Sequence, residues 1–354
     1  MKKYFLFFIF IFAACFLFVC PLKAEFFKNF FSQKDMKVLI CLTDSSNASD
    51  KHVNFFAVKH SSSEKFMKIC FIDENISVYQ NQKQNKTLKN VFFETKSAER
   101  PAVIKNKIEN IFNNGITFDY YVFFDNKFLQ KVISIFSKVE DLENNKEILK
   151  IAGSYDAERY TRNMALLKLL KYIYSNITRT NIINMLKSFY NRDFYFTTDF
   201  RLRDFLLSYS KILNENKNFK FADVPVINKQ NILKPDYDGI TKILNFFSQK
   251  LYEKDKESLK IEVLNASEKN RLAIKAANKL RENGFDVFEW GTSAKKYDFT
   301  IILDYIGTYE NSEKIKNILN CGEIIFKPED REYTEISVFL GKDCNIYDKL
   351  DRVQ

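Results

Sequence analysis

The sequence predicts an α/β protein, in which a helix-covered sheet is followed by a second, smaller unit. Short runs of apolar and β-branched residues alternate with segments of helical periodicity. The chain is 46% hydrophobic and 28% charged, which allows a sizeable core. A polar stretch at residues 251–258 separates two regions of regular alternation and is interpreted as a linker. Strands interleaved with helices favour an α/β sandwich for the first region.

The first region, placed at residues 36–250, contains four segments with the composition of interior strands. Each has five or more apolar or β-branched residues, and they cover 36–42, 52–58, 66–72 and 118–124. Pro101 suits the first turn of a helix, and apolar residues follow it at helical spacing as far as Gly115. Further helices are predicted over 126–136, 157–175, 179–189 and 199–213.

The second region, placed at residues 259–345, has a simpler order. Ser267 can cap a helix that runs to about Asn283, and Gly284 suits the position after its end. The predicted strands cover 259–264, 285–290, 299–304 and 335–340, and a second helix covers 312–319. This β-α-β-β-α-β order is that of a ferredoxin-like domain.

The N-terminus predicts where the chain works. Lys2 and Lys3 precede an almost unbroken apolar run from Tyr4 to Leu22. Residues 1–24 therefore form a signal peptide or a membrane anchor, because the run is long enough to span a bilayer and the lysines favour a cytoplasmic start. Cleavage after the small residue Ala24 and lipidation at Cys15 are the alternatives to a retained anchor. In each case the body of the protein lies outside the cytoplasm.

The net charge and the residue composition limit the classes of binding partner and the kinds of site that are expected. The net charge of +10 favours anionic lipid surfaces, phosphate-bearing polymers or nucleic acid, and export argues against nucleic acid. The chain has two histidines, which lack metal-ligand spacing, and no C-x-x-C pair, so a zinc site is not expected. It also lacks a Gly-rich phosphate loop, an HExxH helix and a nucleophile elbow.

Four cysteines lie outside the apolar run. Cys41 and Cys70 sit within predicted strands, where a small buried hydrophobic residue is the expected role. In an oxidising compartment, Cys321 and Cys344 could pair.

A set of motifs in the second region keeps its order and spacing over residues 259–344. They are Ile261–Asn265, the helix from Leu272 to Leu280, Asn283–Val287, Tyr297-Asp298 and Val338–Asp343. Together they resemble the C-terminal domain of the LytR-CpsA-Psr family of envelope proteins.

Shorter motifs in the first region resemble the catalytic domain of the same family. They are Asp44-Ser45, Ser49-Asp50, Phe118–Val122, Asp156-x-x-Arg159-x-x-Arg162-Asn163 and Pro235–Ile243. Each motif alone is weak, and their order along the chain carries the similarity. The resemblance implies a two-domain, membrane-tethered protein of the cell envelope.

The resemblance also implies a chemistry. Family enzymes transfer a glycopolymer from a polyprenyl pyrophosphate carrier to peptidoglycan with the help of a divalent metal. By this similarity Asp44 and Asp50 would hold Mg²⁺, while Arg159 and Arg162, with Asp156, would hold the pyrophosphate. The three helical residues fall within about 120° on one helix face, so both arginines could meet one phosphate.

Leu166 and Leu170 continue the same helix face. An apolar stripe behind a charged opening would suit a lipid carrier with a phosphorylated head. The alternative is an ordinary amphipathic helix, in which the arginines are solvated and the leucines are core.

The departures from the family pattern bear on activity. Residues 71–75 read Phe-Ile-Asp-Glu-Asn where the family has Ser-Ile-Pro-Arg-Asp, so Glu74 replaces an arginine and Asn75 replaces a carboxylate. The arginine expected near Asp44 is also absent. Losing one donor to a transition state typically lowers the rate by about 10²–10³.

Two hypotheses follow. The favoured one is a non-catalytic or weakly active binder or scaffold for lipid-linked or wall glycans, which meets other envelope proteins through its C-terminal domain and does not bind nucleic acid. The alternative is a Mg²⁺-dependent phosphotransferase that attaches glycopolymers to peptidoglycan.

Overall fold

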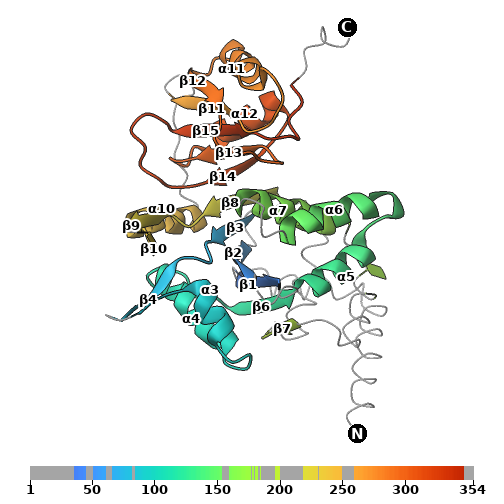
Figure 1. The fold of residues 1–354 in the computed structure, drawn as a ribbon, viewed down its shortest axis with the longest axis vertical. Coiled ribbons are helices and arrows are strands. Elements are labelled where there is room, and N and C mark those ends of the chain that lie inside the picture. Colours follow the sequence, from blue (N-terminus) through green and yellow to red (C-terminus); the bar gives the residue numbers. More distant parts are fainter. Residues whose placement is uncertain are drawn as a thin grey trace, which may run out of the picture.

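The computed structural model describes most of the chain from residue 36 onward (Figure 1). The described ranges are 36–44, 51–60, 66–81, 84–153, 159–176, 178, 180–181, 184, 196–199, 218–229, 231–248 and 259–346. The predicted helices at 179–189 and 199–213 therefore lie largely outside the described residues, as does the N-terminal apolar run. Within the described part, no helix is both long and apolar enough to cross a membrane.

Groups of strands are interleaved with helices along the described part of the chain, as the sequence predicts. The strands are β1 (Met36–Asp44), β2 (His52–His60), β3 (Phe66–Ile72), β4 (Ser77–Asn81), β5 (Gln84–Thr87), β6 (Tyr120–Asp125), β7 (Phe196–Thr198), β8 (Asn218–Asp223), β9 (Val226–Lys229), β10 (Ile232–Pro235), β11 (Ile261–Asn265), β12 (Val287–Thr292), β13 (Ile301–Asp304), β14 (Glu323–Phe326) and β15 (Ile336–Leu340). The helices are α3 (Leu88–Glu94), α4 (Arg100–Ile111), α5 (Asn126–Phe136), the 3₁₀ turn η1 (Val139–Asp141), α6 (Leu142–Gly153), α7 (Arg159–Ser175), α10 (Tyr237–Phe247), α11 (Leu272–Glu282) and α12 (Tyr309–Leu319).

One sheet runs through both regions. Its eleven described strands have the order β12-β11-β15-β13-β14-β8-β3-β2-β1-β6-β7. The antiparallel strand β2 separates β1 from β3, while β6 is parallel to β1 and β8 is parallel to β3. The strands β1, β3, β6 and β8 therefore point the same way. The division of the chain into domains at residues 250 and 259 stays a prediction.

Helices cover both faces of the first region, which confirms a mixed α/β layering. One face packs against α3, α4 and α10 through a core that contains Leu39, Phe55, Phe92 and Ile108. The other face packs against α5, α6 and α7 through a second core that includes Phe71. Alternate residues of each strand enter opposite cores, as the period of two requires.

The ferredoxin-like order predicted for the second region is wrong. Its five strands are ordered β12-β11-β15-β13-β14, and β11 pairs in parallel with β12, as β13 does with β14. Two β-α-β units thus lie side by side, with β15 between them, parallel to β11 and antiparallel to β13. The sequence reading missed β14, a four-residue strand directly after Cys321-Gly322, and so it counted too few strands.

The first helix of this region begins later than predicted. Ser267 does not cap it, because the Ser267 backbone N–H and hydroxyl both donate to Asn265 Oδ1, at 3.0 and 2.8 Å. Such local side-chain bonds hold a turn instead of a helix. The helix starts at Leu272, and Gly284 ends it as predicted, with a φ of 81° that favours glycine.

The cysteines are placed as expected. Cys41 and Cys70 are buried and free. Cys321 and Cys344 form a disulfide with a Cα–Cα distance of 5.5 Å, which confirms the pairing.

Candidate functional site

Acidic residues gather where the parallel strands of the first region end. Asp44 and Asp125 are the last residues of the neighbouring strands β1 and β6, and Asp223 is the last residue of β8. Asp73 follows β3 directly. The carboxyl ends of parallel strands meet at one sheet edge, which is where open α/β sheets commonly bind ligands. This carboxyl edge is the candidate site.

Arg159, the first residue of α7, occupies the β3–β8 part of this edge. Its guanidinium donates through Nη1 to Asp223 Oδ2 at 3.2 Å and through Nη2 to Asp223 Oδ1. Nη1 also lies 3.4 Å from Asp73 Oδ2. The Tyr160 hydroxyl donates to Asp223 Oδ2 at 2.9 Å. Two carboxylates therefore neutralise the arginine that the sequence assigned to a pyrophosphate.

Burial and charge act on this cluster together. Burial lowers the pKa of Arg159, but Asp223 and Asp73 outweigh it and raise the pKa above its ordinary value. Burial, followed by Asp223, raises the pKa of Tyr160. The same two causes raise the pKa of the Cys70 thiol. Arg159 therefore stays charged. The raised pKa values keep the Tyr160 phenol and the Cys70 thiol protonated, so neither is activated as a base or a nucleophile.

Glu74, which replaces a family arginine, is turned into the protein. Its Oε1 lies 2.6 Å from His52 Nδ1, and its Oε2 accepts from the Val53 N–H at 3.0 Å. The side chains of His52 and Glu74 are 11% and 8% exposed, so the pair is largely buried. Glu74 thus connects the turn after β3 to the start of β2. Glu74 stabilises this edge of the sheet. It supplies no positive charge at the position where the family resemblance expects an arginine.

The segment 73–76 is a tight turn. The Asn75 N–H donates to Asp73 Oδ1 at 2.8 Å, and the Ile76 N–H donates to the Asp73 carbonyl at 3.2 Å. An aspartate that bonds to the backbone two residues ahead is typical of such turns. The turn fixes Asp73 beside Arg159.

The predicted site residues are only partly tested. Arg159 lies at the edge beside Asp73, and Arg162 lies one turn further along α7, half-buried. Asp44 ends β1 opposite His52, which places its backbone near the Glu74 pair. The side chain of Asp44 and both residues Asp50 and Asp156 lie outside what the structure describes. Their assignment stays a prediction.

The described residues do not offer a metal site. No three His, Cys, Asp or Glu side chains among them lie together as a metal ion would need. Asp73 and Asp223, two carboxylates at this edge, are both engaged by Arg159. A role for Mg²⁺ therefore depends on Asp44 and Asp50.

The apolar stripe of α7 is core, as the alternative interpretation held. Leu166 is 3% exposed and packs in the second core with Leu129 and Phe299. Leu170 is half-buried. The helix therefore does not present Leu166 to a lipid chain.

Sequence reasoning missed Asp223, Tyr160 and the partnership of His52 with Glu74. Asp223 ends a short strand after a long segment without strong periodicity, and nothing in its neighbourhood indicates an arginine 64 residues earlier. A charged residue at the end of an apolar strand was the available signal, whereas Asp44 was singled out by the resemblance of Asp44-Ser45 to a family motif.

The second region is a domain of known class. Residues 258–343 match the LytR_C family model, described as LytR cell envelope-related transcriptional attenuator. The match confirms the resemblance for the C-terminal domain of the chain. No curated protein matches the sequence at a significant level.

Solved structures similar to this chain include the following three. TagV from B. subtilis has a TM-score of 0.45 and 16% identity, covering 61% of this chain and 97% of its own. A transcriptional regulator from Enterococcus faecalis has a TM-score of 0.45 and 13% identity, covering 61% and 87%. A structure of TagT bound to LIIa-WTA has a TM-score of 0.45 and 10% identity, covering 61% and 91%. Because these TM-scores are below 0.5, nothing about function is inferred from them.

Proposed function

We propose that this chain is an exported, membrane-tethered protein of the cell envelope, of the LytR-CpsA-Psr type. Its first domain binds a lipid-linked or wall glycan without catalysing transfer, or with weak activity. The LytR-type domain at residues 258–343 supports the placement in the envelope. The ligand class rests on the family resemblance of the first domain.

The absence of efficient catalysis is proposed because the guanidinium of Arg159 is already bound by carboxylates. A guanidinium that stabilises a transferring phosphate must be available to it. Here Arg159 is bound bidentately by Asp223 and is also 3.4 Å from Asp73. A phosphate would have to compete with two carboxylates that are already in place. The edge therefore favours modest binding over transition-state stabilisation.

Glu74 points to the same conclusion. A buried carboxylate beside the site repels a pyrophosphate, and this carboxylate cannot swing away without leaving the Val53 N–H without its acceptor. The site keeps groups suited to sugar hydroxyls, because carboxylates accept and a guanidinium donates hydrogen bonds. Arg159 remains 25% exposed, so a ligand can approach it in competition with the two carboxylates.

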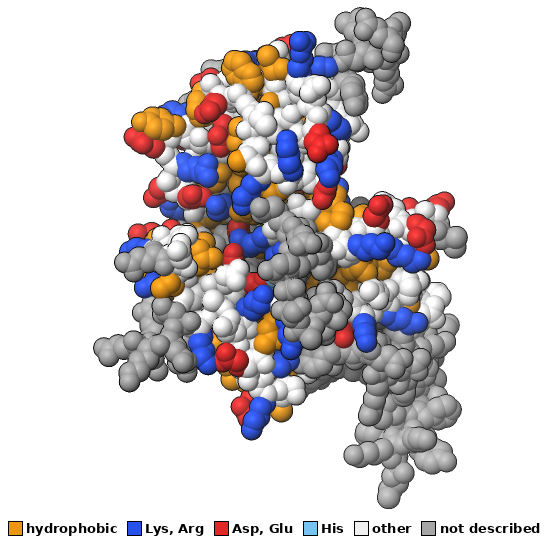
Figure 2. Space-filling view, viewed as in Figure 1, with side chains coloured by type: hydrophobic (Ala, Val, Ile, Leu, Met, Phe, Trp, Pro, Cys, Tyr) orange, Lys and Arg blue, Asp and Glu red, His pale blue; other side chains and the backbone are white. Residues whose placement is uncertain are grey.

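The distribution of charged side chains on the surface favours binding at a local site over binding to a broad basic surface. Figure 2 shows lysine and arginine side chains mixed with acidic ones over the visible face, with no single basic field. Binding on this face would therefore depend on particular groups.

The alternative is the Mg²⁺-dependent phosphotransferase. It is favoured by one feature, since the structure brings Arg159, the 73–75 turn and the end of β1 to one sheet edge. In that function Asp44 and Asp50 would hold the ion, and Arg159 would leave its carboxylates for the phosphate.

A calorimetric titration separates these functions. The full-length chain in mild detergent is titrated with a short-chain polyprenyl pyrophosphate, with Mg²⁺ and with EDTA, beside an Arg159→Ala/Arg162→Ala variant. The matched control is Lys146→Ala, on the exposed side of α6. The binder predicts affinity that is similar with Mg²⁺ and EDTA and at least tenfold weaker in the double variant. Strictly Mg²⁺-dependent binding would favour the transferase, and equal binding in all three proteins would overturn the proposed site.

A further inference from the structure

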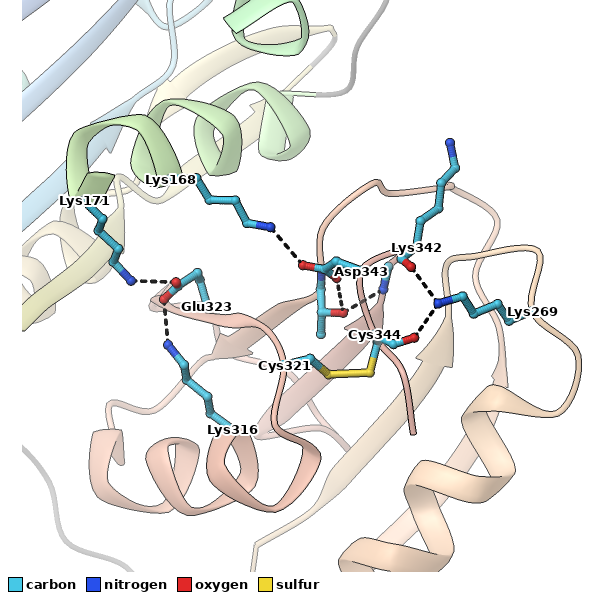
Figure 3. Close-up of polar contacts among 11 residues, drawn as sticks. Lys168, Lys171, Lys269, Lys316, Cys321, Glu323, Lys342, Asp343 and Cys344 are labelled. Atoms are coloured by element: carbon cyan, nitrogen blue, oxygen red, sulfur yellow. Dashed lines mark hydrogen bonds and ion pairs between the residues drawn. A yellow bond between two sulfur atoms is a disulfide. The ribbon is translucent and has the colours of Figure 1, made fainter. Parts of the chain in front are cut away.

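The disulfide lies where the C-terminal domain meets helix α7. Cys321 precedes β14 and Cys344 follows β15, so the bond ties together two segments 23 residues apart. Each segment carries a carboxylate beside its cysteine, Glu323 on one and Asp343 on the other. Figure 3 shows both carboxylates pointing toward α7.

Two lysines of α7 bind these carboxylates. Lys171 Nζ lies 2.6 Å from Glu323 Oε1, and Lys168 Nζ lies 3.2 Å from Asp343 Oδ2 (Figure 3). The Lys168 ammonium also sits 3.8 Å from the centre of the Phe299 ring. The last half of α7 is therefore attached to the two segments that the disulfide connects.

These ion pairs are partly shielded from water, which makes them stronger than exposed pairs. Glu323 is 17% exposed and is shared by Lys171 and by Lys316 at 2.8 Å. Burial raises the pKa of Glu323, but the two lysines outweigh it and lower the pKa below its ordinary value. Glu323 is therefore charged at neutral pH and holds α7 and α12 at once.

The Asp343 segment is positioned from several sides. Asp343 Oδ1 accepts from the Thr300 N–H and hydroxyl, at 2.7 and 2.8 Å. Lys269 Nζ donates to the carbonyls on either side of Asp343, those of Lys342 and Cys344, both at 2.7 Å. The disulfide adds the covalent connection from this segment to the Glu323 segment.

The two regions also meet at other places in the described part of the chain. The strands β14 and β8 pair over two residue positions, Ile325 with Phe221 and Phe326 with Ala222. Apolar contacts between α7 and the sheet of the C-terminal domain add to the junction. The Tyr309 hydroxyl also donates to the Phe219 carbonyl at 3.2 Å, and Lys242 Nζ lies 2.7 Å from Asp330 Oδ1. The Glu323 and Asp343 segments supply the described ion pairs between the C-terminal domain and α7.

Helix α7 carries this placement to the candidate site. Arg159 begins the helix and Lys171 lies twelve residues further, about 18 Å along a rigid axis. We propose that the Cys321–Cys344 disulfide is a redox-sensitive lock that holds α7 against the C-terminal domain and so fixes Arg159 at the carboxyl edge. The effect on ligand affinity rests on the proposed function, whereas the effect on α7 does not.

Opening of the lock is a thiol–disulfide exchange with a dithiol reductant. Cys321 is half-buried and Cys344 is fully buried, so a thiolate attacks Cys321 Sγ. A bond forms between the reductant and Cys321 Sγ, the Cys321–Cys344 bond breaks, and Cys344 leaves as a thiolate that takes a proton. The second thiol of the reductant then displaces Cys321, so that the reductant becomes a disulfide and the protein holds two thiols.

Hydrogen–deuterium exchange tests the lock directly. The full-length chain is compared before and after dithiothreitol, beside Cys321→Ser/Cys344→Ser, which should resemble the reduced protein and not respond to dithiothreitol. We expect exchange in α7 to rise at least threefold on reduction. A Lys168→Met/Lys171→Met variant keeps the disulfide and should show the same rise, which keeps the test valid if the serine variant does not fold.

Two results would overturn the lock. One is faster exchange confined to residues 259–346 with α7 unchanged, since the disulfide would then be only a local staple. The other is no change anywhere on complete reduction. The affinity for polyprenyl pyrophosphate, expected to weaken at least threefold on reduction, is a separate readout. If no binding is found in either redox state but α7 loosens, the lock holds and the proposed function fails.

Discussion

Arg159 and Asp223 lie 64 residues apart in the sequence and share two hydrogen bonds at the carboxyl edge of β8. The pair joins the start of α7 to the end of a central strand. In this pair Asp223 binds the guanidinium that the sequence analysis assigned to a phosphate. A ligand that binds the Arg159 guanidinium must compete with the Asp223 carboxylate. Ligand binding at this edge therefore opposes the contribution of the Arg159–Asp223 pair to the stability of the fold.

Replacing Asp223 by Asn tests this opposition. The free energy of unfolding should fall by about 2–3 kcal/mol, because a buried cation loses its bidentate partner and keeps only Asp73. Chemical denaturation measures the loss. Affinity for pyrophosphate should rise in the same variant. Glu143→Gln, which breaks an exposed pair with Lys146, is the control and should change stability by less than about 0.5 kcal/mol. A more stable Asp223→Asn variant would contradict the role given to the pair.

Restoring the family arginine at position 74 should damage the fold. Glu74→Arg removes the acceptor of the Val53 N–H and places a cation beside His52, so we expect a loss of about 2–4 kcal/mol in thermal or urea unfolding. Glu74→Gln is the matched control, since its amide oxygen can still accept from Val53. It should lose clearly less. A Glu74→Arg protein as stable as the parent would mean that the edge can accommodate a clamp.

Gly341 should tolerate no side chain. A Cβ atom there would lie 2.7 Å from both the Phe299 carbonyl oxygen and the Thr300 nitrogen, which are backbone atoms that cannot turn aside. Gly341→Ala should destabilise the protein by about 3 kcal/mol or more. Gly291→Ala is the control, because the nearest atom to its Cβ is a leucine methyl at 3.8 Å. Equal melting temperatures for the two variants would contradict the close approach.

Asp304 should make stability depend on pH. Burial raises its pKa to about 6, although its carboxylate accepts from Gly307 and Ser312. The folded state then binds the proton more tightly than the unfolded chain, so the free energy of unfolding should rise as the pH falls from 7 through 6. Relative to Asp304→Asn, the parent should gain about 1 kcal/mol between pH 7 and pH 5 in urea unfolding. An equal pH dependence in both proteins would exclude this carboxyl as the cause.

Much of the fold could be predicted from the sequence because it depends on local patterns. The strands predicted at residues 36–42, 52–58 and 66–72 follow from largely apolar runs and are observed at 36–44, 52–60 and 66–72. Helix α5 was predicted at its observed bounds. The topology of the C-terminal domain could not be predicted from the sequence. Its strand β14 has only four residues and no turn signal beyond Gly322. Missing one short strand changed the predicted order of the whole unit.

The site could be predicted only in part, for a different physical reason. Asp44 and Arg159 were proposed from motifs that resemble the family, and no local pattern predicted that they would share one sheet edge. The partners of those residues are set by tertiary packing, so neither the capture of Arg159 by Asp223 nor that of Glu74 by His52 has a local signal. The same holds for Leu166, whose burial depends on the domain that α7 meets.

A turnover assay tests the central claim most directly. The full-length chain is incubated with a labelled glycopolymer on a polyprenyl pyrophosphate carrier, with peptidoglycan and Mg²⁺, and label fixed to peptidoglycan is counted against the Arg159→Ala variant. A non-catalytic site predicts equal, background levels of fixed label in both proteins. Efficient Mg²⁺-dependent transfer by the parent, lost in Arg159→Ala, would contradict the account and show that Arg159 leaves its carboxylates to serve catalysis.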